Sequence, residues 1–157
     1  MGYGKHVYKE TVTHGKVCAK RDMTVSKNAS LEEIREFFAH DRFATVACGA
    51  VIVCAEEGHA ICEMDISDIH LNAMGNVMGG AIFSLADFAL AIASNLGESP
   101  SVSVSNTIDF MNRAKGKKLI AECSAEKDGR SLGFYHTIVT DDLGTSVARM
   151  TAVCVRV

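Results

Sequence analysis

The chain has 157 residues, of which 48% are hydrophobic and 22% charged, and its formal net charge is −3. This length allows one globular domain with a substantial core and leaves no room for a second full domain. Residues 1–30 hold six Lys or Arg residues, whereas residues 31–157 are acidic, a balance that argues against nucleic acid as the main partner. We expect residues 1–30 to form a solvated, partly mobile N-terminal extension and residues 31–157 to form the domain.

Six cysteines occur in a chain whose first ten residues are polar and lack the apolar segment of a secretion signal. We therefore expect a cytoplasmic location and reduced thiols. No two cysteines have C-x-x-C spacing, and the only close Cys/His neighbours are His14 and Cys18, so we expect no metal site. Cys48, Cys54 and Cys62 are interpreted as small buried hydrophobic residues on strands.

The first predicted element is an amphipathic helix over residues 30–43. It starts at a possible N-cap, Ser30, and carries apolar residues at helical spacing, namely Leu31, Ile34, Phe37 and Phe38. Two runs rich in β-branched and small residues follow, residues 45–54 and 59–66, with Glu56, Glu57 and Gly58 between them. This pattern predicts two strands joined in a hairpin.

Residues 79–96, GGAIFSLADFALAIASNL, contain one charged residue, Asp87, and no proline. The segment predicts a helix that protein surrounds on nearly all sides. We reject a membrane span because an aspartate at its centre costs roughly 2.5–3.5 kcal/mol on insertion scales. Gly97 and Pro100 are expected to close the helix.

Four strands are predicted after the helix, over residues 101–110, 118–127, 131–140 and 145–157, with turn residues between the last three. In the first of them, apolar residues alternate with polar ones, which predicts one apolar and one polar face. The last three are expected to form a meander. An antiparallel sheet that curls around the single long helix is the simplest way to bury it, so the predicted class is α+β.

Asp87 is the first candidate for chemistry, because an ionised carboxylate in an apolar helix is costly unless it is paired, hydrogen-bonded or solvated by a cleft. Gly80, Ser84, Ala91 and Ser94 share its side of the helix and form a small, partly polar stripe. A ligand or another chain can approach such a stripe closely. A functional carboxylate and a polar contact between subunits both fit this pattern.

The loop of residues 70–80 brings glycine amides to the start of the long helix. The N-terminus of a helix carries partial positive charge and free N–H donors, which can polarise a carbonyl group. A tight turn without a ligand fits the same glycines. His70, in this loop, is interpreted as a hydrogen-bonding loop residue rather than a catalytic base.

The run from His70 to Asp87, the segment SVSVSNTIDF and the turn of residues 127–130 resemble the PaaI-like branch of the hotdog thioesterases. The resemblance covers about residues 31–157. That family has an Asn, six residues later a His-Gly-Gly, and nine residues after the His an Asp in a LAD-like helix. Asn72, Met78 and Asp87 have this spacing. The resemblance implies a hotdog fold, in which the sheet wraps one central helix.

The resemblance also implies catalytic roles. Asp87 would be the general base or the nucleophile, Asn72 would position water or substrate, the Gly79 amide would polarise the thioester carbonyl, and Ser103 would be a lesser active-site residue. The implied reaction converts an acyl-CoA to a free acid and coenzyme A, which is part of the substrate, with no further cofactor. In the related enzymes the loop of one subunit faces the aspartate of another, so a homodimer or homotetramer is expected.

Substrate contacts are expected from Met78, Gly80 and Ser84, and from Gly129 and Arg130, where the family often has a Gly-basic pair. Cations near the strand ends are candidates for binding the phosphates of coenzyme A, although each also fits a solvated turn. They are Arg113, Lys115, Lys117, Lys118, Lys127 and Arg130. The sequence does not distinguish between aromatic, short-chain and medium-chain acyl groups as the substrate.

Met78 departs from the family pattern, because it stands where the family has histidine. A thioether neither donates a strong hydrogen bond nor titrates. Two hypotheses follow: an acyl-CoA thioesterase in which the carboxylate and the backbone donors suffice, and a non-catalytic hotdog protein that binds an acyl-CoA or a related thioester. A dehydratase of the same fold is disfavoured, because those enzymes typically use a histidine.

Overall fold

The computed structural model describes residues 25–97 and 99–157. Most of the expected N-terminal extension, including His14 and Cys18, lies outside the described residues. Val25, which the sequence assigns to the extension, is buried and forms a bridge with Leu96. Val25 is therefore packed against the domain, whereas Ser26, Lys27 and Asn28 after it are exposed.

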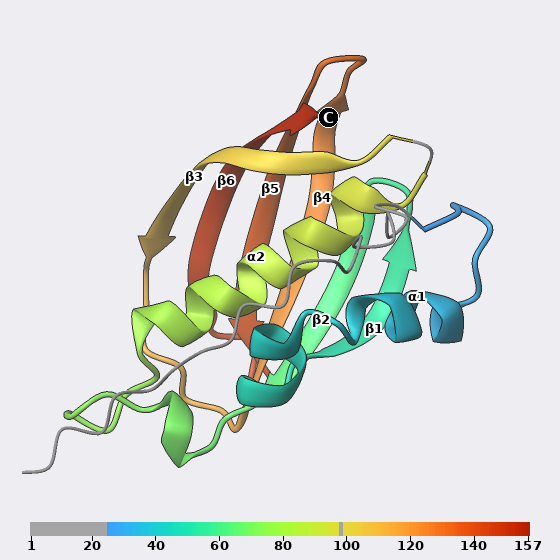
Figure 1. The fold of residues 1–157 in the computed structure, drawn as a ribbon. Coiled ribbons are helices and arrows are strands. Elements are labelled where there is room, and N and C mark those ends of the chain that lie inside the picture. Colours follow the sequence, from blue (N-terminus) through green and yellow to red (C-terminus); the bar gives the residue numbers. More distant parts are fainter. Residues whose placement is uncertain (1–24, 98) are drawn as a thin grey trace, which may run out of the picture.

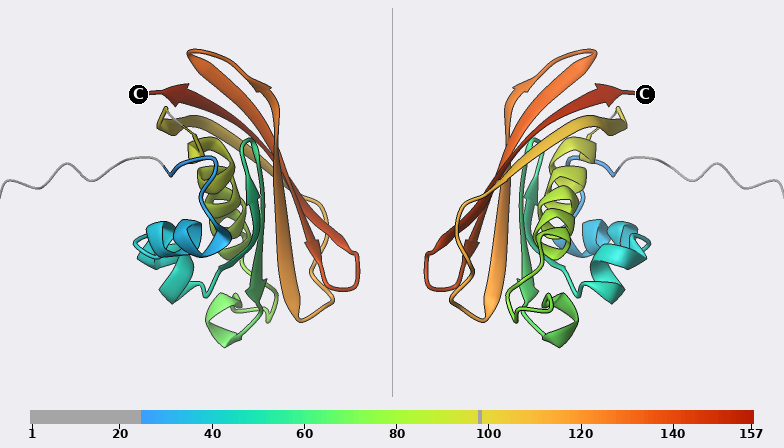
Figure 2. Two further views of the ribbon diagram at one scale, coloured as in Figure 1. Left: turned by 90° about the vertical axis from the view of Figure 1, so that its right-hand side faces the viewer. Right: turned by 90° about the vertical axis from the view of Figure 1, so that its left-hand side faces the viewer.

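The described elements are two α-helices, two short helical turns and six strands. In chain order they are α1 (Leu31–Phe38), η1 (Phe43–Ala47), β1 (Val51–Glu56), β2 (His59–Asp65), η2 (Asp68–His70), α2 (Gly79–Asn95), β3 (Ser101–Phe110), β4 (Lys118–Asp128), β5 (Leu132–Asp141) and β6 (Ser146–Arg156). The strands form one antiparallel sheet in the order β1-β2-β4-β5-β6-β3. The sheet curves around α2, and α1 and η1 lie on the same side of the sheet (Figures 1 and 2).

The predicted first helix and first strand need correction. α1 begins with a capping box between Ser30 and Glu33, as the sequence suggests, but it ends at Phe38 instead of residue 43. Residues 43–47 form a π-helical turn, closed by a 2.9 Å hydrogen bond from the Cys48 N–H to the Phe43 carbonyl. The first strand therefore begins at Val51 and not at residue 45. A short run of small apolar residues fits a buried turn as well as a strand.

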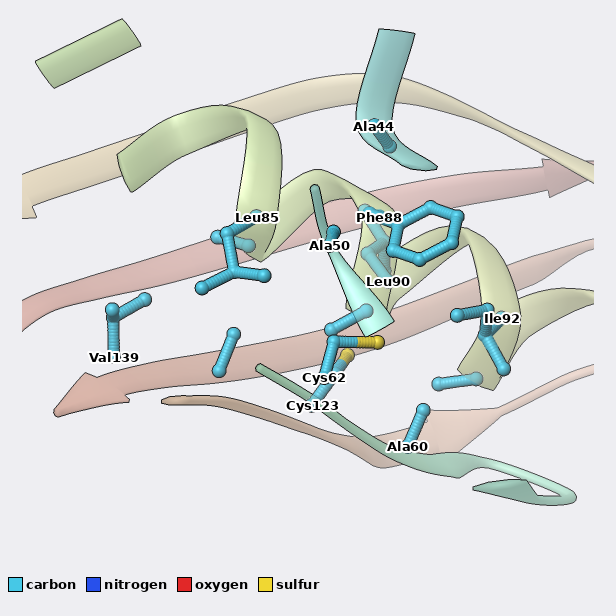
Figure 3. Packing of buried hydrophobic residues seen from close by; sticks show 14 of the residues in the cluster. Ala44, Ala50, Ala60, Cys62, Leu85, Phe88, Leu90, Ile92, Cys123 and Val139 are labelled. Atoms are coloured by element: carbon cyan, nitrogen blue, oxygen red, sulfur yellow. The ribbon is translucent and has the colours of Figure 1, made fainter. Parts of the chain in front are cut away.

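α2 packs its apolar side chains into the concave face of the sheet. Leu85, Ala89 and Ile92 are fully buried at positions i, i+4 and i+7, the spacing of one helical face. Figure 3 shows Leu85 and Ile92 in the buried cluster with Cys62 and Cys123 of the sheet. The prediction of a helix buried nearly all round is confirmed, and no helix of the described residues is long and apolar enough to cross a membrane.

The thiols follow the prediction in part. Cys62 is a fully buried strand residue, as interpreted, whereas Cys54 is only half-buried in β1. Cys48 is buried but follows the η1 turn and is not on a strand. All three behave as packing residues, although only one of them has the predicted combination of strand and full burial.

The predicted alternation of β3 is wrong, because the strand contains a β-bulge. Its register against β6 shifts between Ser103 and Ser105. Ser103 then pairs with Cys154 and Asn106 pairs with Ala152, and both of these β6 residues are buried. Since paired residues of an antiparallel sheet point to the same face, Ser103 and Asn106 both face α2.

Candidate active site

Asp87 lies on α2 between two cavities. A cavity of about 260 Å³ is lined by α2, the start of β3 and Cys154. A smaller cavity of about 90 Å³ lies between α2 and the segment that carries Asp41. No ion pair involves Asp87 in the described part of the chain, and its Oδ1 accepts a hydrogen bond from Asn106 Nδ2 at 3.3 Å. The half-buried carboxylate is thus open to ligand on two sides.

Three effects act on the pKa of Asp87. Burial raises it, the like charge of Asp41 raises it further, and the hydrogen bond from Asn106 lowers it, with a net rise above the ordinary aspartate value. A raised pKa makes the carboxylate a better proton acceptor than a surface aspartate, as a general base requires.

The small stripe on α2 borders the cavities on either side of Asp87. Ser84 and Gly80 line a cavity of about 230 Å³ with Met78, and Ser84 also lines the small cavity at Asp87. Ala91 and Ser94 line the larger cavity. The Ser84 hydroxyl donates to the Gly80 carbonyl at 2.8 Å. The residues of this stripe therefore line three separate cavities along α2.

Gly79 is the first residue of α2, and the N-cap, Met78, offers no side-chain hydrogen bond. The first amides of a helix lack intrahelical acceptors. The Gly79 N–H is therefore free to donate a hydrogen bond to a carbonyl oxygen, as its predicted role requires. A Cβ on Gly79 would lie 3.0 Å from Cζ of Phe110, a tight contact with the end of an exposed side chain. Gly79, Phe110 and Arg113 line a cavity of about 360 Å³.

Met78 lies beside the glycines, and the residue is 45% exposed. A Cβ on Gly80 would come within 2.9 Å of the terminal methyl group of Met78. The thioether therefore folds back over the first turn of α2. It narrows the 230 Å³ cavity with carbon and sulfur and places no titratable group there.

Asn72 shapes the loop before α2. Its Oδ1 accepts hydrogen bonds from the N–H groups of Met74 at 2.9 Å and Asn76 at 3.2 Å. The carboxamide oxygen is thus used inside the loop, and the residue itself is exposed. His70 holds the other end of this loop, because its carbonyl accepts from the Met78 N–H and its Nδ1 accepts from the Ser67 N–H. His70 is a hydrogen-bonding loop residue, as interpreted.

The Gly79 amide and Asp87 are separated along α2 by eight residues. At 1.5 Å per residue this is a distance of about 12 Å, too far for both groups to act on one thioester carbonyl. The Asn72 loop lies before the same end of the helix as Gly79. One chain therefore contains two separate halves of the predicted catalytic set.

The turn of Gly129 and Arg130 lies at a different cavity, of about 340 Å³, which Lys27 and Arg156 also line. A Cβ on Gly129 would lie 2.9 Å from the Leu132 carbonyl oxygen. Arg156 binds the Asp128 carboxylate and two backbone carbonyls, and Lys27 lies 3.9 Å from the Glu57 carboxylate, which lines the same cavity. Arg130 is therefore the cation that this cavity offers to an anion.

The other predicted cations differ in availability. Lys118 lies 2.6 Å from Glu63 and is paired, whereas Arg113 lines the cavity at Gly79. Within residues 25–97 and 99–157, no group of three His, Cys, Asp or Glu side chains is placed to hold a metal ion.

The comparison with known proteins shows the family of this chain. A family model described as the thioesterase superfamily matches residues 74–148. Human acyl-coenzyme A thioesterase 13 is 31% identical over 120 residues, which are 74% of this chain and 86% of the relative. The chain belongs to the thioesterase superfamily.

Its PaaI-like character follows from two comparisons. The Escherichia coli acyl-coenzyme A thioesterase PaaI is 31% identical over 115 residues, 70% of this chain and 82% of PaaI. The solved E. coli PaaI structure covers 82% of this chain and 96% of its own, with a TM-score of 0.71 and 28% identity. The predicted hotdog fold and thioester hydrolase function are confirmed, and a non-catalytic binding protein is disfavoured.

A third comparison concerns coenzyme A. A solved Streptococcus mutans structure bound to acetyl-CoA has a TM-score of 0.65 and 27% identity to this thioesterase. It covers 69% of this chain and 88% of its own.

Sequence reasoning missed two residues beside the carboxylate of this thioesterase, Asn106 and Asp41. Regular alternation along β3 predicts that Asn106 and Ser103 point to opposite faces of the sheet. The bulge in β3 puts both side chains on the same face. The predicted helix over residues 30–43 contains Asp41, whereas the structure has it in the segment between α1 and η1. Its proximity to Asp87 depends on how that turn packs on α2.

Proposed function

We propose that this thioesterase hydrolyses an acyl-CoA to a free acid and coenzyme A, with Asp87 as the reacting carboxylate and the Gly79 amide as donor to the thioester oxygen. The observation that carries the proposal is the setting of Asp87. It is the one charged residue of an otherwise apolar helix, it borders two cavities, and a neutral amide is its side-chain hydrogen-bond partner among the described residues.

Two routes use the same groups. In the first, Asp87 takes a proton from water while the water oxygen attacks the carbonyl carbon, and the oxyanion is stabilised by the Gly79 N–H. In the second, Asp87 attacks the carbonyl carbon directly, and water then hydrolyses the resulting anhydride. In both, the C–S bond breaks and the coenzyme A thiolate accepts a proton. Both require Asp87 to be ionised.

A homodimer or homotetramer would bring the Gly79 amide of one copy close to Asp87 of another. Because about 12 Å of helix separates Gly79 from Asp87 in one chain, we place the Gly79 and Asn72 end of one copy opposite Asp87 and Ser103 of another. β3 is an edge strand of the described sheet and carries exposed Val102, Val104 and Phe110. An exposed apolar edge of this kind favours pairing with a further chain.

Coenzyme A is expected to bind along the remaining cavities. Arg113 at the Gly79 cavity and Arg130 at the Gly129 turn offer cations for its phosphates. The apolar cavity beside Met78 and Ser84 is available to the acyl group or the pantetheine chain. The acetyl-CoA in the S. mutans structure supports a coenzyme A thioester as the ligand class.

The test is a panel of aromatic, short and medium acyl-CoA substrates assayed with the wild type and with Asp87→Asn. We expect kcat to fall by about 10² to 10⁴, the usual contribution of a general base. Asp65→Asn is the matched control, because Asp65 is an exposed carboxylate on β2 whose cation lies 3.9 Å away. Hydrolysis undiminished in Asp87→Asn, with the fold intact by circular dichroism, removes Asp87 from the mechanism.

The oligomer needs its own test. Sedimentation should give a dimer or a tetramer, and mixing Asp87→Asn with Gly79→Pro, a variant without the amide donor, should restore part of the activity in mixed oligomers. A monomer that is fully active would contradict a site shared between copies.

A further inference from the structure

The bulge in β3 gives Asn106 an unusual position. Without it, residues 103 and 106 would point to opposite faces of the sheet, because they are three positions apart. With it, both face α2, and Asn106 Nδ2 lies 3.5 Å from the Ser103 hydroxyl oxygen. Asn106 is half-buried, so its side chain is held between the sheet and the helix.

The amide of Asn106 reaches Asp87. Its Nδ2 donates to Asp87 Oδ1 at 3.3 Å, and a carboxylate can only accept, so the NH2 group must face it. The Asn106 Oδ1 is buried and has no hydrogen-bond partner among the described residues. A buried polar atom without a partner is costly, which suggests a role that packing alone does not explain.

We propose that Asn106 is a positioning residue of the thioesterase reaction: its NH2 group orients the Asp87 carboxylate and stabilises its ionised form between α2 and β3. The proposal rests on the proposed role of Asp87. Asn106 itself touches the carboxylate and Ser103 and acts on the substrate through them.

The charges around Asp87 show why such a donor is needed. Asp41 faces it from the segment between α1 and η1, and the Cys154 thiol faces it from β6. Burial and the charge of Asp41 raise the pKa of Asp87, and burial likewise raises the pKa of Cys154, which keeps that thiol neutral. Within the described residues, Asn106 is the group that opposes this rise.

The unpaired Oδ1 of Asn106 could accept a hydrogen bond from Asp87 after Asp87 takes a proton from water. When Asp87 takes a proton from water, it becomes a hydrogen-bond donor, and the NH2 group then faces a hydroxyl. Rotation of the amide by half a turn brings Oδ1 to the protonated carboxyl group as an acceptor. The same side chain thus complements both protonation states of Asp87, which an aliphatic residue of this size cannot do.

The test is the pH dependence of kcat/KM in Asn106→Ala and Asn106→Asp, with Thr107→Ala as the matched control. Thr107 is the exposed neighbour on β3, and it pairs with Thr151 on the opposite face. In kcat/KM the acid limb reports the ionisation of the free enzyme. We expect this limb to move to higher pH in Asn106→Ala and further in Asn106→Asp, which adds a like charge, and to stay in place in Thr107→Ala.

The size of the effect should depend on pH. On the acid limb, kcat/KM of Asn106→Ala should fall about tenfold, as expected for a lost hydrogen bond to a charged group, whereas the loss should be smaller on the alkaline plateau. A loss that is equal at all pH values, with the limb unmoved, would show a structural role and overturn the proposal. Wild-type kinetics in Asn106→Ala would overturn it as well.

A measurement without substrate separates this proposal from the role of Asp87 in catalysis. Carbon-13 NMR of labelled aspartate carboxyl groups should show Asp87 titrating at higher pH in Asn106→Ala than in the wild type. If Asp87→Asn stays active but this titration shifts, the catalytic role fails and the positioning contact stands. If Asp87→Asn is inactive but neither titration nor pH profile responds to Asn106, the positioning role fails alone. Asn106→Asp conserves the size of the side chain. If the alanine variant does not fold, the pH profile and the titration are measured on Asn106→Asp instead.

Discussion

Replacing Asp41 by asparagine should shift the acid limb of activity in the direction opposite to that of Asn106→Ala. Asp41 lines the small cavity that Asp87 also lines, and its charge is one cause of the raised pKa of Asp87. Asp41→Asn keeps the shape of the side chain and removes the charge. The pKa of Asp87 should therefore fall, and kcat/KM should persist to lower pH than in the wild type.

The structure also limits the size of this effect. Asp41 is exposed, so water screens its interaction with Asp87. Two unit charges 4 Å apart interact by about 1 kcal/mol in water and less at larger separations, so the gain on the acid limb should not exceed about fivefold. Screening by salt should reduce it further, because the Debye length falls from about 10 Å at 0.1 M to about 3 Å at 1 M.

The assay is the pH profile of kcat/KM for one acyl-CoA at low and high salt, with Glu36→Gln as a control. Glu36 is an exposed acid on α1 that lines neither cavity at Asp87. We expect a gain at low pH in Asp41→Asn that largely disappears at 1 M salt, and a smaller response in Glu36→Gln. A shift toward higher pH, or a gain that high salt leaves intact, would refute the electrostatic reasoning.

Two stability predictions concern residues away from the carboxylate. Leu85→Ala removes a fully buried side chain of α2 and should cost about 2–5 kcal/mol in a urea titration; a cost below 1 kcal/mol would contradict the packing described. For Asp141, burial acts to raise the pKa, but hydrogen bonds from the N–H groups of Lys115, Thr145 and Gly116 hold it well below its usual range. Its stabilising effect should be complete above about pH 4, the ordinary aspartate value, and be lost as the pH falls further. The wild type should therefore exceed Asp141→Asn in stability at pH 7 and approach it in acid, and a gap that widens on acidification would count against this.

The strands after α2 and the long helix could be predicted from local signals. The 17 residues of α2 are long and apolar enough to predict a buried helix from the sequence. The strands β3 and β4 begin at the predicted residues, 101 and 118. Turn residues between β4, β5 and β6 separate strands that also neighbour one another in the sheet. These elements depend on short-range chemistry, which a single sequence contains.

The errors occur where tertiary packing decides between two local options. The segment of residues 43–47 has the composition of a strand but closes a π turn. In β3, regular alternation of Val and Ser is compatible with an unbroken strand, yet the bulge exchanges the two faces after Ser103. No local preference in SVSVSNTIDF marks the residue at which the register shifts.

The site was predictable to the extent that it is local in sequence. Asp87 and the stripe beside it follow from helical spacing, and the spacing of Asn72, Met78 and Asp87 carried the family resemblance. Asn106 and Asp41 were not predictable, because their contacts with Asp87 depend on the bulge and on the packing of a turn. The distance between the Gly79 end and Asp87 became clear only as a length along α2.

The rate at which the buried cysteines react with an alkylating reagent should report how often the core of this enzyme opens. Cys62 and Cys123 lie on neighbouring strands of the core with no exposed surface, and burial raises the pKa of Cys123 to about 11. Only thiolates react readily with alkylating reagents, so labelling at these positions requires the sheet to come away from α2. Among the cysteines of residues 25–157, the half-buried Cys54 in β1 should be modified first. The delay before Cys62 and Cys123 are modified measures how often the domain opens without added denaturant.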